Sequence, residues 1–130
     1  MERNTGHLLA IAEQIRNEPE TLNMEYWRAI RGLNDGVGRC GTASCIGGWS
    51  QALRGVSPPD ESDSDVYAAM GLTEEEGNDL CYDDGVSLFH LLPVDDRGER
   101  FADILTAIAH GANVKETLDA ALDAADAVTA

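Results

Sequence analysis

Apolar residues recur at intervals of three and four positions along most of the chain, which is the spacing of one face of an α-helix. In the first such segment, Leu8, Ile11 and Ile15 fall on one side. The same spacing predicts helices over residues 5–17, 21–32, 43–54 and 65–70, from Thr73, over 101–108 and from Val114. The pattern therefore indicates an all-α fold.

Capping residues and glycines mark the expected ends of these helices. Thr5 and Thr42 are placed to cap the helices that follow them. Thr73 and Glu76 have the spacing of a capping box. The glycines placed to stop helices are Gly32, Gly55, Gly71 and Gly111.

Two stretches depart from the helical pattern. Residues 56–64 are expected to form an exposed acidic loop, because the Pro58-Pro59 pair cannot continue a helix. Residues 83–96, DDGVSLFHLLPVDD, combine apolar residues with turn signals, so a loop and a short strand both stay open there.

The chain has 130 residues, enough for one domain with its own core. We expect a compact single domain over residues 1–130, built of five to seven short helices. Its central helix is expected at about residues 43–54. There Gly47 and Gly48 each cost about 1 kcal/mol of helix stability relative to Ala, and such a pair is tolerated where another backbone comes very close.

Two of the three cysteines stand in the segment CGTASCIGGW, residues 40–49, which has three interpretations. Cys45 could be a small apolar side chain packed in the core. Alternatively, Cys40, Cys45, Cys81 and His90 could bind zinc, since the first two have a permissible ligand spacing. Cys45 could also be a nucleophile activated at a helix N-terminus. We expect the packed cysteine and no cofactor, because no second close-spaced pair and no general base accompany the motif.

The distribution of charge suggests a kind of partner. The chain carries 24 acidic and 9 basic residues, a formal net charge of −15. Such a field disfavours direct binding to nucleic acid or to an anionic membrane. Between residues 55 and 96 there are twelve acids and no Lys or Arg, whereas residues 1–54 are neutral. We therefore expect a basic protein as the partner.

We predict that the acidic segment binds, and inhibits, a basic host macromolecule of the nucleic-acid-binding kind by imitating a phosphate backbone. The residues expected to make this contact are Asp60, Glu61, Asp63, Asp65, Glu74, Glu75, Glu76, Asp79, Asp83 and Asp84. The alternative for the segment is a solvated surface that serves solubility. The alternative for the whole protein is a Cys/His zinc-binding structural protein. Neither the acidic binding protein nor the zinc-binding protein is expected to be an enzyme.

The cysteine count and the N-terminus indicate a compartment. Three cysteines are an odd number with no disulfide framework, which favours a reducing environment. The first twenty residues contain only the short apolar run LLAIA, too short for a signal peptide or a membrane span. We expect a soluble protein in the cytoplasm.

The segments MEYW, CGTASCIGGWSQAL and AAMGLTEEEGNDL together resemble a group of small uncharacterised proteins encoded by tailed phages, prophages and some bacteria. The resemblance covers most of residues 20–112. It implies a phage or mobile-element origin, and hence the cytoplasm of a host cell, but no activity. Some members have histidines flanking the Cys motif, where this chain has Arg39 and Trp49. That difference disfavours an obligatory metal site.

Overall fold

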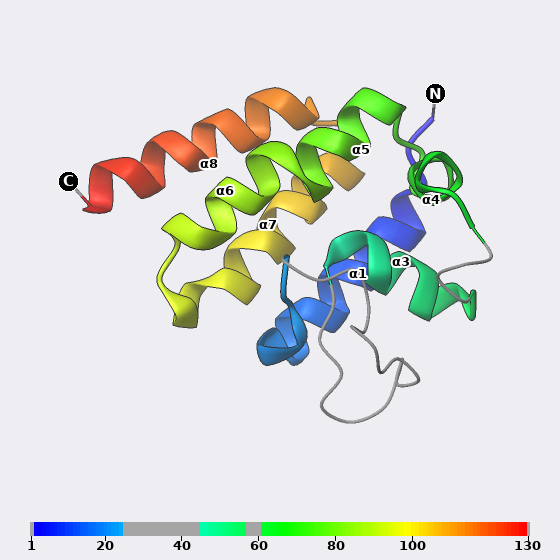
Figure 1. Cartoon of the computed structure of the whole chain (residues 1–130), viewed down its shortest axis with the longest axis horizontal. Helices are drawn as coiled ribbons and strands as arrows, with labels where there is room; N and C mark the ends of the chain where they lie inside the picture. Colours follow the sequence, from blue (N-terminus) through cyan, green and yellow to red (C-terminus); the bar gives the residue numbers. More distant parts are fainter. Residues whose placement is uncertain (1, 25–44, 57–60, 130) are drawn as a thin grey trace.

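The computed structural model describes residues 2–24, 45–56 and 61–129 (Figure 1). Over these residues it contains seven α-helices and two short 3-10 turns, which confirms the all-α prediction. The elements are α1 (Thr5–Asn17), η1 (Pro19–Thr21), α3 (Ile46–Arg54), α4 (Asp63–Ala69), α5 (Glu74–Cys81), α6 (Asp83–Leu91), η3 (Val94–Asp96), α7 (Arg97–Ala109) and α8 (Val114–Thr129). Most of the helix expected over residues 21–32 lies outside the described residues.

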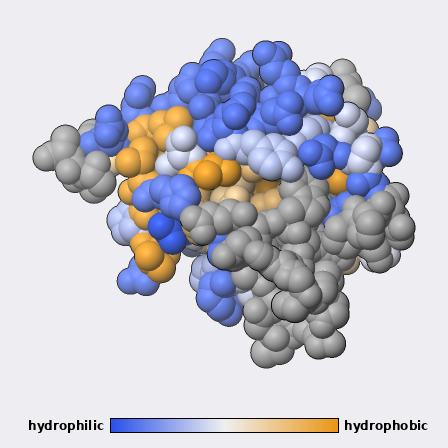
Figure 2. Space-filling model, in the orientation of Figure 1, coloured by the Kyte–Doolittle hydropathy of each residue, from blue (hydrophilic) through white to orange (hydrophobic). Residues whose placement is uncertain are grey.

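The helices are arranged around α7. The most extensive pairing is between α1 and α7, while α5, α6 and α8 pack against one another on the other side (Figure 1). The shorter helices α3 and α4 join α1 to α5. Figure 2 shows hydrophilic side chains along the top of the view, where α5 and the start of α8 lie in Figure 1.

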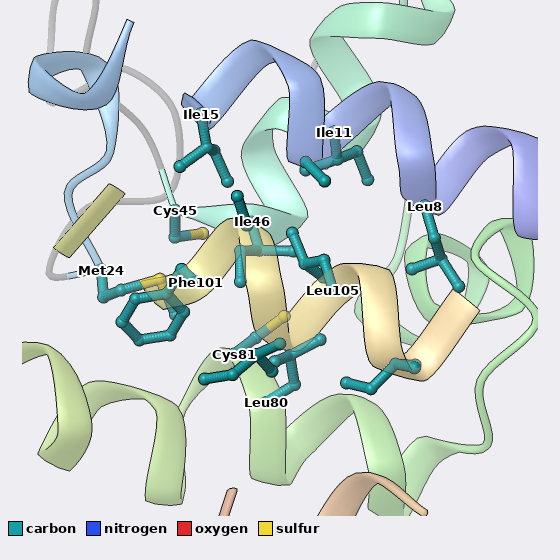
Figure 3. Close-up of a cluster of buried hydrophobic side chains, with 14 of the residues drawn as sticks. Leu8, Ile11, Ile15, Met24, Cys45, Ile46, Leu80, Cys81, Phe101 and Leu105 are labelled. Carbon is teal, nitrogen blue, oxygen red and sulfur yellow. The ribbon is translucent and has the colours of Figure 1, made fainter. Parts of the chain in front are cut away.

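A single cluster of buried apolar side chains holds these helices together. Leu8 and Ile11 of α1 and Phe101 and Leu105 of α7 are fully buried within it (Figure 3). Cys81 of α5 points into the same cluster. Full burial of one large apolar side chain contributes about 1.5–3 kcal/mol, so this cluster is the main source of stability.

Helix α3 is buried along most of its length but begins later than expected. All residues from Ile46 to Gln51 are buried, as expected of a central helix. The helix starts at Ile46 and not at residue 43, because Cys45 is its N-cap: the Gly48 amide donates to Cys45 Sγ at 3.5 Å. Thr42, which lies outside the described residues, is therefore not the cap of this helix.

Several other helix ends agree with the sequence, but α4 and α7 begin at Asp63 and Arg97, earlier than predicted, and α1 has a different cap. The Thr73 and Glu76 side chains each accept from the other residue's backbone amide, at 3.1 and 2.9 Å, which confirms the capping box. The φ angles of Gly55, Gly71 and Gly111 are all positive, at 74°, 76° and 102°, as required of glycines that terminate helices. Asn4, and not Thr5, caps α1 by accepting from the His7 amide at 3.3 Å.

The segment over residues 83–96 is neither loop nor strand for most of its length, since it forms α6 and η3. Leu88 and Leu92 are four residues apart and both buried, which is the helical period that the turn signals obscured. Gly85, a poor helix former, is required in α6 because a Cβ there would overlap the Leu80 carbonyl.

The loop expected over residues 56–64 is shorter than predicted. Ser62 caps α4 by accepting from the Asp65 amide at 3.2 Å, so the helix begins at Asp63. Residues 57–60, including Asp60, lie outside the described residues.

We predict that Gly77→Ala destabilises the fold by about 1–3 kcal/mol, the usual cost of overpacking a core. A Cβ at Gly77 would overlap the ring of Tyr67. That ring is fully buried, and its hydroxyl donates to Asn78 Oδ1 at 3.0 Å, so it has no room to move away. Urea unfolding measures the change. Gly6→Ala is the control, because nothing lies within 4 Å of its added Cβ, and equal stability of the two variants would contradict the prediction.

Candidate functional site

Four of the predicted partner-binding acids form one group, which we call the acidic face: Glu75, Asp79, Asp83 and Asp84. Glu75 and Asp79 are one helical turn apart on α5, and Asp83 and Asp84 begin α6. Partial burial raises the pKa of the Asp79 carboxyl, and the charges of Asp84, Glu75 and Asp83 raise it further, while Lys115 opposes them. The structure therefore brings the other three carboxylates close enough to repel that of Asp79.

Lys115 lies beside the acidic face and was missed in the sequence analysis. It is the only lysine of the chain, and its Nζ lies 2.6 Å from Asp84 Oδ2 and 3.4 Å from Asp119 Oδ1. The hydrogen bond to Asp84 is the main cause of the raised pKa of the ammonium group. The spacing of Lys115 and Asp119 on α8 was visible in the sequence, but their packing beside α6 was not.

Three other predicted acids lie around the start of α4. The Ser64 hydroxyl donates to Glu74 at 2.8 Å, and the Tyr82 hydroxyl donates to Asp63 Oδ2 at 3.3 Å. Asp65 is exposed in the first turn of α4. Because Tyr82 immediately precedes α6, Asp63 extends the acidic region toward the acidic face.

Glu61 and Glu76, two of the predicted partner-binding residues, form ion pairs within the fold. Both carboxylate oxygens of Glu61 accept from the Arg54 guanidinium at 2.8 Å, and its side chain is only 13% exposed. Glu76 accepts from Arg3 at 3.0 Å and from the Thr73 amide within the capping box. An acid held by an internal cation presents little net charge to a partner.

The two described thiols are buried and unreactive in character. Cys45 is 2% exposed and Cys81 is 1% exposed. Burial raises the pKa of Cys45 to about 11, and burial also raises the pKa of Cys81 well above its usual range. Both groups are therefore neutral thiols near pH 7, whereas the thiolate is the form that acts as a nucleophile or binds metal.

The structure does not assemble the alternative zinc site from its described members. Within residues 2–24, 45–56 and 61–129, no three His, Cys, Asp or Glu side chains lie close enough together to hold a metal ion. Cys45 and Cys81 are in the core, whereas His90 is exposed near the end of α6. Cys40 lies outside the described residues.

A polar cluster that the sequence analysis missed joins α1, α3 and the approach to α4. His7 Nε2 lies 2.7 Å from Ser50 Oγ, and the Arg54 guanidinium donates to Ser50 Oγ at 3.3 Å. Because an arginine only donates, we assign the Ser50 proton to a bond with neutral His7. Burial lowers the pKa of His7, and the charge of Arg54 lowers it further. Ser50 is fully buried, so this Ser-His pair cannot reach a substrate.

No protein-family model, curated protein or solved structure matches this chain. The resemblance to phage-encoded proteins therefore stays a prediction. Among the described helices, none has the length and apolar character needed to cross a membrane.

We predict that Cys45 reacts with iodoacetamide about 100-fold more slowly in the native protein than in the urea-unfolded chain at about pH 8, and that the reaction of Cys81 is also slowed. A pKa near 11 leaves about that much less thiolate than the ordinary value does. Mass spectrometry of the labelled peptides measures each cysteine separately. Labelling of native Cys45 at the unfolded rate would revive the thiol-enzyme interpretation.

We predict that His7 makes stability depend on pH between about pH 7.5 and 5.5. Its folded pKa lies below its unfolded value of about 6.5, so its contribution is complete above that value and is lost as the pH falls through the folded pKa. Urea unfolding of wild type and of His7→Gln over this range measures the effect. The wild type should lose more stability than the variant on acidification; parallel curves would count against the assignment of neutral His7.

Proposed function

We propose that this protein is a small acidic binding protein, without enzymatic activity, that occupies a basic groove on a nucleic-acid-binding protein and blocks it. The observation that carries this proposal is the acidic face. Glu75, Asp83 and Asp84 all lie near enough to Asp79 to raise its pKa, and in the described structure Lys115 pairs with Asp84 among them.

The spacing of these carboxylates suits a surface built to attract cations. Residues four apart on a helix are separated by about 6 Å along its axis, within a factor of two of the axial spacing of phosphates on one DNA strand, about 3.4 Å. The face stands on helices held by a buried core, so the charges are fixed before a partner arrives. Preorganised charge of one sign gives fast association that weakens with salt.

The burial of both described thiols and of the serine bonded to His7 supports a binding role over a catalytic one. Cys45, Cys81 and Ser50 are all buried, and the pKa of each thiol is raised. The resemblance to phage-encoded proteins is the reason for proposing that the partner belongs to a host cell. On that basis the protein would act in the host cytoplasm.

We predict that reversing three charges, in Glu75→Lys with Asp79→Lys and Asp83→Lys, weakens partner binding about ten-fold or more. Exposed ion pairs are worth about 0.2–1 kcal/mol each, and every reversal also adds repulsion. Immobilised protein would capture host proteins from a bacterial lysate at about 50 mM salt and release them at about 0.5 M, where screening is strong. Purified partner and its nucleic acid would then be tested for competition.

The control reverses the same number of charges elsewhere, in Glu13→Lys with Glu20→Lys and Glu99→Lys. These three residues are exposed and lie on α1, η1 and α7. Glu76 is left unchanged in both variants because its reversal would break the ion pair with Arg3. Equal binding by the two triple variants, or partners held independently of salt, would refute the proposal.

A further inference from the structure

An apolar hollow of about 170 Å³ opens between α6, α7 and α8, away from the acidic face. Its floor is formed by Leu88, Leu92, Ile104 and Ala125, all of which are at most 7% exposed. Lys115 and Asp84 pair at the start of α8 and α6, whereas the hollow lies toward the ends of these two helices. Figure 2 shows hydrophobic surface at the left of the view, where α6 and α8 end in Figure 1.

The size of the hollow is set by small residues on α8. Ala121, Ala124 and Ala125 line it where longer side chains would fill the space between α8 and the other two helices. A cavity of about 150 Å³ lined by aliphatic side chains is known to accommodate benzene. The volume therefore suits a single ring or a short alkyl chain, and it is too small for a helix of a partner protein.

One cation stands at the rim of this hollow. Arg100 lines it, and within the described part of the chain this exposed guanidinium has no hydrogen-bond or ion-pair partner. Asp103, also at the rim, is already paired with Arg16 at 2.7 Å. The third charged residue that lines the hollow is Asp96, one helical turn before Arg100.

We propose that this hollow binds a small apolar monocarboxylate, with its ring or alkyl chain on the floor and its carboxylate on Arg100. A planar guanidinium pairs with a carboxylate through two parallel hydrogen bonds, which fixes the orientation of the ligand. The apolar floor supplies the affinity that an exposed ion pair alone does not. This site is independent of the proposed function of the acidic face.

Benzoate is the probe, titrated into the full chain while NMR follows the methyl groups of Ala121 and Ala125. Benzyl alcohol and benzylamine carry the same ring with a neutral and a positive head. We expect saturable shifts, with benzoate bound more tightly than either analogue. Arg100→Gln should weaken benzoate binding about ten-fold or more, the worth of a hydrogen bond to a charged group. Lys115→Gln, which makes the same change in net charge, should leave it unchanged.

Filling the hollow provides the second test. Ala121→Leu should abolish binding, whereas Ala120→Leu, at an exposed position of α8 that does not line the hollow, should not. If Ala121→Leu fails to fold, the comparison of Arg100→Gln with Lys115→Gln still tests whether benzoate binds at this hollow. Tighter binding of benzylamine, shifts that do not saturate, or equal loss in the Arg100 and Lys115 variants would overturn the proposal.

Discussion

Burial of the facing sides of α1 and α7 supports every other part of the molecule. Ile11 from α1 and Phe101 and Leu105 from α7 are fully removed from water, and they meet Ile46 of α3 and Leu80 of α5 in the same cluster (Figure 3). Helices shorter than about twelve residues are marginal by themselves in water. Helices α3 to α6 are all of that kind. Their shape, and with it the acidic face, therefore depends on this shared apolar cluster.

Ion pairs within the fold determine which carboxylates remain for a partner. Arg3 donates to the carbonyls of Ile108 and Ala112 at 2.8 and 3.0 Å, and so ties the N-terminal segment to the end of α7. Its other nitrogen donates to Glu76 at 3.0 Å, which ties the N-terminal segment to α5. Arg54 forms a similar ion pair with Glu61. A count of acids along the sequence therefore overstates the charge available for binding.

Most features set by neighbouring residues were predictable, whereas contacts between particular distant residues were not. The Thr73 capping box and the end of α3 at Gly55 follow from local backbone chemistry, and the structure confirms both. The predicted start of α3 was wrong because its N-cap is Cys45, and cysteine is not among the residues preferred at that position. The hydrogen bond of His7 with Ser50 joins residues 43 positions apart, and no periodicity indicates it. The acidic residues of α5 and α6 could be read from the sequence. The position of Lys115 beside them could not, because it comes from a part of the chain 31 positions away from Asp84.

The position of Asp79 bears on the binding role that we propose for the acidic face. Acids at the first turns of α4, α5 and α6 interact favourably with the helix N-termini, each by about 0.3–1 kcal/mol. Asp79 lies in the second turn of α5, beyond the region where this effect acts, and its neighbours are mostly carboxylates. Its charge therefore costs stability in the free protein. Partial burial is the largest cause of the raised Asp79 pKa, and the repulsion from these neighbours adds to it. In the proposed complex, a cation from the partner would offset that repulsion.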